Sequence, residues 1–268
     1  SRTKAIKSIK VKANKAFGNN KLDYPIFTEK PNLKWKSIVL RNSGNDFGRM
    51  LFRDGFLQTL IASNMDIDHQ AYEPSVVFMN GEYYAMLGIR ERTNKDFVYS
   101  NYGLSEEDIC IEAASAKATE CDDYQSVLDI ANNSDMNAKD IFEQMDEIID
   151  IDECLNYFMS EIYICNEDWS AGNIKAWHRR NDGKWRWILY DTDYSTSLYG
   201  NYLSTNGFDY AARCKFFSQF IKNEEFKRRL MTKFVVHAGT TFEAEHVSQV
   251  LDSLIGLLEP EADYFFNH

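Results

Sequence analysis

The spacing of apolar residues changes about one third of the way along this chain, near residue 92. Residues 7–13 alternate between apolar and polar side chains, as in a half-buried strand, and residues 35–41 contain the apolar strand core Ile38–Leu40. Past residue 93, apolar residues recur at the three- and four-residue spacing of helices. The helices that we predict are 140–149, 151–165, 216–236 and 244–258. We therefore predict an α+β fold with a strand-rich N-lobe, residues 1–92, a mainly helical C-lobe, residues 93–268, and a ligand cleft between them.

Two local signals refine the N-lobe. Asp46 is a residue type that caps helix amino termini, so the apolar spacing after it predicts one helix from there to about Ser63. Further along, Asn80-Gly81 separates two apolar runs, residues 75–79 and 83–89. Asn-Gly supplies the positive φ angles of a two-residue turn, so this stretch predicts a β-hairpin.

The charge balance argues against one class of function. The 268 residues carry 30 Lys and Arg against 41 Asp and Glu, a net charge of −11, which argues against a protein that binds nucleic acid by neutralising phosphates. Residues 1–41 hold 11 basic against 2 acidic side chains, and residues 105–168 hold 2 against 19. The basic segment fits either a phosphate-facing surface or a solvated strand edge. We interpret the acidic segment as a solvated helical face, with recognition of a basic acceptor as the alternative.

Cysteine content, hydropathy and the first residues set further limits. Five cysteines without C-x-x-C spacing predict neither a zinc site nor a disulfide framework. The five histidines lack metal-ligand spacing, and we interpret each as a surface or core residue. No apolar run approaches the roughly 18 residues of a membrane span. The sequence starts at Ser1-Arg2 without Met, so we expect an amino-terminal segment to be missing, and the compartment stays open.

One segment combines polar residues in a spacing that suits phosphoryl transfer. Asp168 and Asn173 lie five residues apart after a helix, a hairpin with its turn at residues 181–184 follows, and Asp191-Thr-Asp193 ends the second strand. Folding the hairpin back brings Asp168, Asn173 and Asp191 to one end. The oxygens of Asn173 and Asp191 suit Mg²⁺, and Asp168, which stays off the metal, can take a proton from an attacking hydroxyl. Kinases use a catalytic-loop Asp, an Asn five residues later and a further Asp in these roles. The alternative is that both aspartates are turn and cap residues of an ordinary hairpin.

In this order, the motifs resemble those of the CotH (spore coat protein H) kinase family, whose members are atypical protein-kinase-like enzymes. The resemblance covers essentially the whole chain. The residues that carry it are Asn80–Tyr84, Glu91–Phe97, Asn166–Trp169 with Asn173, Trp185 with Asp191 and Asp193, Ser1-Arg2 with Lys7-Ser8, Leu40–Asn42 with Asp46, and Phe226–Leu230.

The resemblance implies a bilobal protein-kinase-like fold that binds ATP and Mg²⁺ (or Mn²⁺) in the cleft. By this resemblance Asp168 is the catalytic-loop acid that acts on the acceptor hydroxyl. Asn173 and Asp191 hold a metal ion, and Asp193 reaches a second one. All of these residues lie in the predicted C-lobe.

The same resemblance implies where the nucleotide binds. Trp185 stacks on the adenine, Glu91 lies at the hinge or the cleft edge, and the phosphate-binding loop lies at or before Ser1-Arg2. Lys7 matches the family's position for the cation that holds the phosphates. Three other cations are alternatives for this role: Lys10, Lys36 and Arg41.

The implied function is transfer of the γ-phosphate of ATP to Ser or Thr hydroxyls of a protein acceptor, in an envelope-associated or extracytoplasmic protein; a cytoplasmic location stays open. Asn166-Glu167 stand where typical kinases have His-Arg, and Asp191-Thr-Asp193 replaces Asp-Phe-Gly. These departures favour a small-molecule phosphotransferase as the first alternative. A coat or surface-assembly module without catalysis is the second, and a glycosyltransferase using Asp191 and Asp193 is the third.

Overall fold

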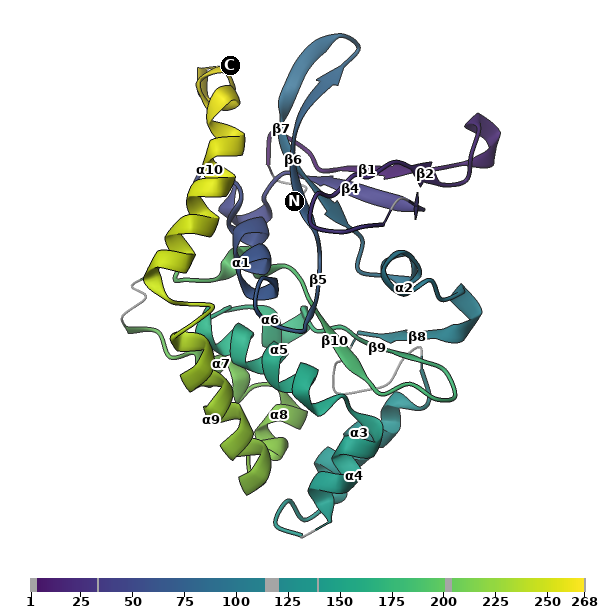
Figure 1. The fold of residues 1–268 in the computed structure, drawn as a ribbon, viewed down its shortest axis with the longest axis vertical. Helices are drawn as coiled ribbons and strands as arrows, with labels where there is room; N and C mark the ends of the chain where they lie inside the picture. Colours follow the sequence, from purple (N-terminus) through teal and green to yellow (C-terminus); the bar gives the residue numbers. More distant parts are fainter. Residues whose placement is uncertain (1–3, 33, 114–120, 139, 201–203, 268) are drawn as a thin grey trace.

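The computed structural model describes residues 4–32, 34–113, 121–138, 140–200 and 204–267 (Figure 1). One sheet lies at one end of the molecule and most helices at the other, with the last helix running up to that sheet and a second sheet beside the helices. The chain has a mixed α+β architecture, as predicted. Among the described residues, no helix is both long and apolar enough to cross a bilayer.

A four-stranded antiparallel sheet occupies the strand-rich end. Its order is β1 (Ile9–Lys12), β4 (Ser37–Arg41), β7 (Glu82–Glu91) and β6 (Tyr72–Met79). The predicted strands and hairpin are confirmed, and Asn80 and Gly81 both have positive φ in the turn between β6 and β7. A small second pair, β2 (Leu22–Asp23) with β3 (Lys34–Trp35), and a 3₁₀ turn, η1 (Lys15–Phe17), flank this sheet.

The first helix begins later than we predicted. A 3₁₀ turn, η2 (Gly44–Asp46), follows β4, and α1 spans Arg53–Ala62. Leu51 has a φ of 70°, which interrupts any continuous helix from Asp46. The buried carboxylate of Asp46 instead accepts hydrogen bonds from the backbone N–H groups of Met50 and Arg53, and so fixes the turn that leads into α1.

A second sheet has the order β5 (Asp68–His69), β10 (Arg186–Leu189), β9 (Ala176–Arg179) and β8 (Ile109–Glu112). It contains the predicted hairpin, but the turn differs from the expectation. Asn181 has the positive φ, and Gly183 does not. A Cβ on Gly183 would lie 2.6 Å from the backbone N of Arg179, so glycine is required there for close approach.

Helices make up most of the remaining described chain. α5 (Ile151–Tyr163) is buried at their centre, and the predicted helix 216–236 is two helices separated at Asn223, whose side chain caps the second. The other helical elements are α2 (Lys95–Tyr102), η3 (Glu106–Asp108), α3 (Tyr124–Asn133), α4 (Ile141–Ile148), α6 (Trp169–Gly172), η4 (Thr192–Tyr194), α7 (Gly207–Ala211), α8 (Lys215–Phe220), α9 (Glu224–Ala238) and α10 (Ala244–Asn267).

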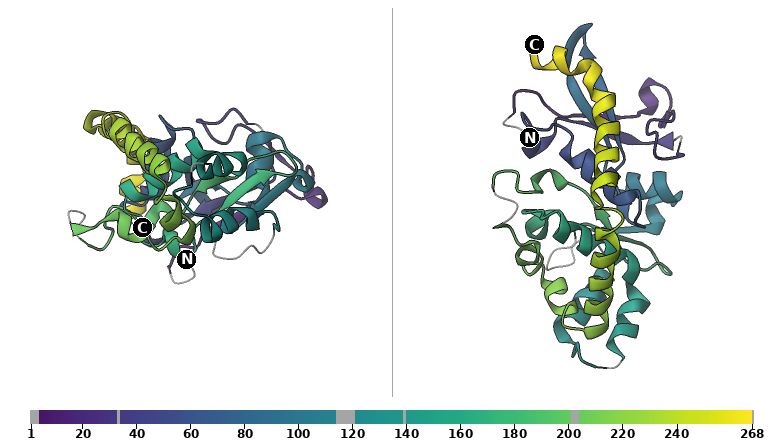
Figure 2. Two further views of the ribbon diagram at one scale, coloured as in Figure 1. Left: turned by 90° about the horizontal axis from the view of Figure 1, so that it is seen from below. Right: turned by 60° about the vertical axis from the view of Figure 1, so that its left-hand side comes forward.

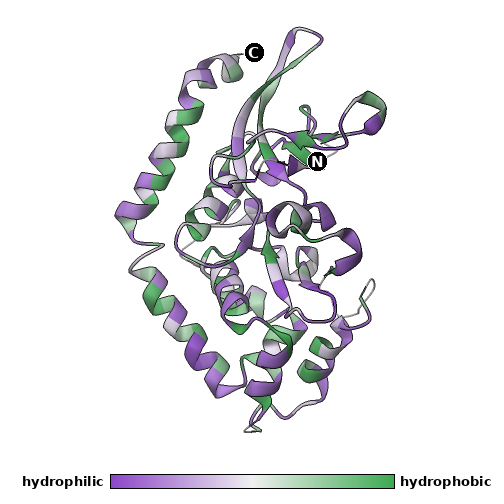
Figure 3. Ribbon diagram, turned by 45° about the vertical axis from the view of Figure 1, so that its right-hand side comes forward, coloured by the Kyte–Doolittle hydropathy of each residue, from purple (hydrophilic) through white to green (hydrophobic). Residues whose placement is uncertain are grey.

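The last helix returns to the strand-rich end. In Figure 2, α10 runs alongside the molecule toward the β6–β7 hairpin, and it contacts α1, β6 and β7. The rings of Tyr83 and Tyr264 lie 4.5 Å apart, and His246 contacts Ser63 at 2.9 Å. Hydrophilic and hydrophobic residues alternate along α10, as expected for a helix that packs on one face (Figure 3). By these contacts the carboxy-terminal helix packs against residues of the predicted N-lobe.

An aromatic core positions the loop segments that carry the predicted catalytic residues. Trp169 and Trp187 are both fully buried, and both pack against Phe158 of α5. Trp169 directly follows Asp168, and Trp187 lies four residues before Asp191. Burial of large aromatic side chains therefore anchors both polar segments to the same helix.

One disulfide joins Cys110 of β8 to Cys121, just before α3. The odd cysteine count and the absence of C-x-x-C spacing did not predict it, because the two cysteines are brought together by the approach of β8 and the segment before α3. The other three cysteines, Cys154, Cys165 and Cys214, are buried thiols.

Candidate active site

Two chain segments meet where the predicted hairpin folds back. The backbone N–H of Glu167 donates to the carbonyl of Tyr194 at 3.1 Å, and that of Thr196 donates to the carbonyl of Ile164 at 2.7 Å. Cys165 adopts a positive φ of 48°, which turns the chain away from α5 between these two bonds. The loop that carries Asp168 is therefore bonded directly to the chain that follows Asp191.

Asp168 lies in an environment that disfavours its charge. Burial, followed by the negative charges of Asp191 and Asp193, raises the pKa of its carboxyl to about 6, while contact with the side chain of Asn173 acts in the opposite direction. Its Oδ1 is buried and has no hydrogen-bond partner among the described residues. The structure thus brings Asp168, Asn173 and Asp191 together, as the sequence spacing predicted.

Arg41, at the end of β4, connects this region to the first sheet. Its Nη2 lies 2.6 Å from Oδ2 of Asp193 and also contacts Oδ1 of Asp191. Burial alone would lower the pKa of the guanidinium, but Asp54, Asp191 and Asp193 together raise it above its ordinary value. Arg41 was one of four cations that the sequence left as candidates to hold phosphate.

Asp193 is held tightly by the turn after β4. It is 1% exposed, and its two oxygens accept bonds from the side chain of Asn45 at 3.0 Å and from its backbone N–H at 3.1 Å. Gly44 has a φ of 56°, and a Cβ there would lie 2.0 Å from Oδ2 of Asp193. Burial raises the pKa of Asp193, and Arg41 partly offsets this. The turn at Ser43–Asn45 is therefore shaped around one carboxylate.

Asp54 of α1 is a site residue that sequence analysis missed. It is 5% exposed, lies 3.1 Å from Nη2 of Arg90 and 3.8 Å from Nε of Arg41, and accepts a 2.8 Å bond from the N–H of Thr192. Burial alone would raise its pKa, but Arg90 and Arg41 hold it at about 2. A sequence signal existed, because this acid lies on the helix face that also carries the apolar Leu57 and Ile61.

Two buried polar residues lie next to the site: Glu161, which sequence analysis missed, and Asn166, which it named in a motif without a role of its own. Both are fully buried, and Nδ2 of Asn166 donates to Glu161 at 2.9 Å and to the carbonyl of Asp191 at 3.4 Å. Burial and the charges of Asp168 and Asp191 raise the pKa of Glu161 well above its ordinary value. Asn166 thus connects α5 to the residue that follows the hairpin.

Two hollows meet at Arg41 and Asp191. The first, of about 280 Å³, lies between the end of β7 and Tyr190. The second, of about 220 Å³, lies over the turn at residues 43–45. Ligand pockets usually measure about 300–1,000 Å³, so a nucleotide-sized ligand would extend through both. The residues that line the first hollow are Val39, Arg41, Gln70, Arg90–Asn94, Lys175, Tyr190 and Asp191; those that line the second are Ser8, Arg41, Asn42, Gly44, Asn45, Asp191 and Asp193.

Of the predicted nucleotide-binding residues, Glu91 lines the first hollow, at the end of β7 where the chain passes toward α2. Its buried carboxylate pairs with Nζ of Lys30 at 2.5 Å and accepts bonds from the Ala71 N–H and the Asn101 amide. Nearby, Lys175 donates to the carbonyl of Thr93 at 2.6 Å. Glu91 therefore shapes the edge of the hollow while its own charge is already paired.

The other predicted nucleotide residues lie elsewhere. Trp185 is 2% exposed, packs 4.3 Å from the ring of His178, and lines a separate hollow that shares no lining residue with the two above. Lys7 is exposed and directs Nζ to the carbonyl of Lys4, although its neighbour Ser8 lines the second hollow. Lys36 pairs with Glu106 at 2.7 Å, and Lys10 is exposed on β1. The phosphate loop predicted at or before residues 1–2 lies outside the described residues.

The donor atoms of the site fit a hard divalent cation. The carboxylate of Asp191 and the amide oxygen of Asn173 are oxygen ligands of the kind that Mg²⁺ prefers. The buried Oδ1 of Asp168, without a hydrogen bond, adds an acceptor that a metal-bound water or a hydroxyl group would satisfy.

The sequence model of the family described as CotH kinase protein matches residues 1–266, essentially the whole chain. A search of curated proteins finds no match.

Proposed function

Because this chain belongs to the CotH kinase family, we propose that it is an ATP- and divalent-metal-dependent kinase that phosphorylates Ser or Thr hydroxyls of a protein. In this proposal the protein is bilobal, with the N-lobe at residues 1–92, the C-lobe at 93–268 and the hinge at the end of β7. Glu91 and the residues up to Asn94 line the adenine end of the cleft.

The observation that carries the proposal is the position of Arg41. It lies where the two hollows meet and contacts Asp191, Asp193 and Asp54. Protein kinases place a cation on the third strand of the first sheet and pair it with an acid on the following helix. Arg41 at the end of β4 and Asp54 on α1 occupy comparable places in the chain order. We therefore assign the phosphate-holding role to Arg41 in preference to Lys7.

Asp168 is the proposed base. The acceptor hydroxyl oxygen forms a bond to the γ-phosphorus, the bond from that phosphorus to the β–γ bridging oxygen breaks, and ADP leaves. The hydroxyl proton passes to Asp168, whose pKa of about 6 suits a base that works near neutral pH.

Asn173 and Asp191 are the proposed metal ligands. A bound Mg²⁺ or Mn²⁺ would neutralise charge that develops on the phosphates. Asp193, which would reach a second metal by family resemblance, is bonded to Asn45 and Arg41. We assign to Asp193 the positioning of Arg41 and of the turn at residues 43–45. Trp185 has no role in this proposal, because it lines a different hollow.

Calorimetric titration of ATP, with and without Mg²⁺ or Mn²⁺, tests the nucleotide site. We expect metal-dependent binding by the unaltered chain, binding weakened at least about tenfold in Asp191→Asn, and unchanged binding in the exposed control Asp122→Asn. Equal binding by Asp191→Asn would contradict the assignment. Transfer of labelled phosphate to a mixture of basic and acidic proteins then tests the kinase activity.

A small-molecule phosphotransferase is the second candidate. It is favoured by Asn166-Glu167, which stand before Asp168 in place of the His-Arg of typical kinases. Asn166 bonds to Glu161 and to the chain at Asp191. A panel of hydroxyl-bearing metabolites, tested beside the protein acceptors, separates the two. Phosphorylation of a metabolite alone, with no protein labelled, would favour the second candidate.

A further inference from the structure

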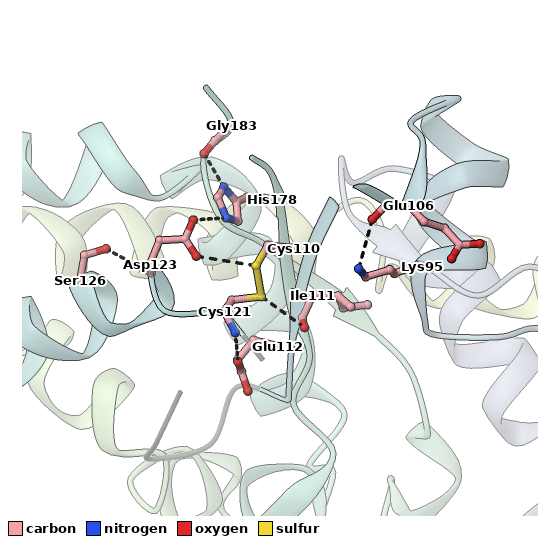
Figure 4. The surroundings of a disulfide bond; sticks show 10 residues. All are labelled: Lys95, Glu106, Cys110, Ile111, Glu112, Cys121, Asp123, Ser126, His178 and Gly183. Atoms are coloured by element: carbon pink, nitrogen blue, oxygen red, sulfur yellow. Dashed lines mark hydrogen bonds and ion pairs between the residues drawn. A yellow bond between two sulfur atoms is a disulfide. The ribbon is translucent and has the colours of Figure 1, made fainter. Parts of the chain in front are cut away.

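A second group of ligand-type side chains lies away from the candidate active site, around the disulfide. Cys110 and His178 are directly opposite one another on the paired strands β8 and β9. Asp123, just before α3, approaches both: its Oδ1 lies 3.7 Å from Sγ of Cys110 and its Oδ2 lies 2.7 Å from Nε2 of His178. Figure 4 shows the three side chains pointing toward one another. The candidate ligand atoms of Cys110, Asp123 and His178 all lie within 4.8 Å of one another.

The orientation of His178 is that of a metal ligand. Its Nδ1 lies 3.2 Å from the carbonyl of Gly183, so a proton on Nδ1 leaves the Nε2 lone pair directed at Asp123 and Cys110. His178 is 5% exposed, and its buried Nε2 makes no hydrogen bond of good geometry although Asp123 is near. With the proton on Nδ1, Nε2 and the carboxylate of Asp123 are two electron-pair donors that face each other. With a doubly protonated ring, the same two groups form an ion pair.

We propose that Cys110, Asp123 and His178 form a Zn²⁺ site that becomes available when the Cys110–Cys121 disulfide is reduced, with the Cys121 thiolate as the fourth ligand. Thiolate, imidazole and carboxylate are the ligand types that Zn²⁺ prefers. The spacing of residues 110, 123 and 178 could not reveal the site in the sequence, because strand pairing brings the ligands together.

The distances are compatible with this metal. Tetrahedral zinc, with bonds of about 2.0–2.3 Å, places neighbouring ligand atoms about 3.3–3.8 Å apart. The 3.7 Å contact already lies in this range, and the 2.7 Å contact must lengthen by about 0.6 Å. The two sulfurs must move apart, which reduction of the bond between them allows. Asp123 is 48% exposed beside a hollow of about 330 Å³, through which an ion can reach the buried side chains.

The redox step is a thiol–disulfide exchange. A dithiol donates two electrons and two protons to the Cys110–Cys121 bond, giving two thiols, and is itself oxidised to a disulfide. Zn²⁺ then displaces the thiol protons to solvent as the thiolates ligate it. The disulfide and the metal site are therefore alternative states of the same two sulfurs.

Metal analysis of the full chain tests this proposal. To remove the contribution of the candidate active site, all samples carry Asp191→Asn. Protein is left oxidised or is reduced with a phosphine, which becomes the phosphine oxide. It is then dialysed without oxygen against ZnCl₂ and analysed for bound zinc. A thiol titration in denaturant should give three free thiols before reduction and five after it.

We expect one zinc per chain in the reduced protein and none in the oxidised protein. Co²⁺ should give thiolate-to-cobalt charge-transfer and tetrahedral d–d absorption in the reduced protein only. Asp123→Asn and His178→Gln should each weaken Zn²⁺ binding at least about tenfold, whereas Asp122→Asn, an adjacent exposed acid, should not.

Three results would overturn the proposal. They are no zinc bound after reduction, equal zinc binding before and after reduction, or unchanged affinity in both ligand variants. His178 packs on Trp185, so circular dichroism is used to check that His178→Gln folds. If His178→Gln does not fold, the zinc affinity of Asp123→Asn, a change at an exposed residue, decides the test.

Discussion

Nη2 of Arg41 lies 2.6 Å from Oδ2 of Asp193, so the last residue of β4 is paired with an acid that follows β10. The two residues are 152 positions apart in the chain. The pair joins the turn at residues 43–45 to η4, and places a guanidinium group where the two hollows meet. Binding of a nucleotide in those hollows would give the same guanidinium new anionic partners.

The first prediction concerns this cation. Arg41→Lys keeps the charge but not the planar fork that spans two carboxylates, so ATP affinity in the presence of Mg²⁺ should fall about tenfold. Arg41→Ala should also lower the free energy of unfolding by about 3 kcal/mol, because buried carboxylates lose their counter-charge. Calorimetry and urea unfolding measure the two effects. Arg179→Lys, an exposed residue at the end of β9, is the control, and wild-type affinity in Arg41→Lys would exclude Arg41 as the phosphate cation.

The second prediction is a pH profile. Because the pKa of Asp168 is raised to about 6, kcat/KM for phosphoryl transfer should rise with pH through about 6 and then level off. Asp168→Asn should lower kcat about 10²–10⁴-fold and leave ATP binding intact. If kcat/KM stays constant between pH 5 and pH 7.5, a range that includes the pKa of about 6, Asp168 is not the base.

The third prediction follows from the same pKa and concerns stability. The carboxyl of Asp168 has a pKa of about 6 in the folded protein and of about 3.8 in the unfolded chain. Between pH 3.8 and pH 6 the folded state therefore binds more protons than the unfolded state. The free energy of unfolding therefore falls as pH rises from about 4 to about 6. Asp168→Asn should stabilise the protein at neutral pH, on the order of 2 kcal/mol, and the gain should vanish near pH 4. Urea unfolding at several pH values measures it, with Asp122→Asn as the control.

The sequence could predict the part of the site that lies close together in the chain. Asp168, Asn173 and Asp191 are separated by one hairpin, and a hairpin brings its two ends together whatever surrounds it. The β6–β7 hairpin was predictable for the same reason. Residue types and spacing also suggested the metal site, with an ordinary hairpin as the alternative, and family resemblance added the role of ATP.

The remaining site residues depend on contacts that no local pattern encodes. The sequence offered Arg41 beside Lys7, Lys10 and Lys36 as candidate cations, and only the fold shows which of them lies against Asp54, Asp191 and Asp193. Asp54 reaches Thr192 across 138 positions. Trp185 was assigned to adenine because it precedes Asp191 at the family's spacing, yet it lies just before β10, in a bridge with Ile149, and packs in a core with Tyr124. The late start of α1 had a similar cause, since the side chain of Asp46 bonds to the turn before the helix instead of to a first helical turn.

The fourth prediction concerns Asp54. Its pKa is held at about 2 by Arg90 and Arg41 against the effect of burial, so its charge stabilises the folded state above about pH 4, and this contribution is lost as pH falls toward 2. Asp54→Asn should lower the free energy of unfolding at pH 7 by about 2 kcal/mol, and the difference from wild type should shrink below pH 4. Urea unfolding against pH measures it. A difference that is the same at pH 7 and near pH 3, between the two pKa values, would mean that lost packing and not lost charge is responsible.

The last prediction compares alanine substitutions at Gly44 and Gly48, to separate a steric clash with Asp193 from the cost of a positive φ. Gly44 and Gly48 both have positive φ, 56° and 80°, so alanine at either position costs about 1–2 kcal/mol in backbone energy. A Cβ at Gly48 would meet no atom within 4 Å, whereas at Gly44 it would lie 2.0 Å from Oδ2 of Asp193. Gly44→Ala should therefore cost about 1–3 kcal/mol more than Gly48→Ala, and should also weaken binding of ATP with metal, because Asp193 and Arg41 must move. Thermal unfolding and calorimetry of the two variants make the comparison, and equal effects on both measurements would show that the turn does not position the site.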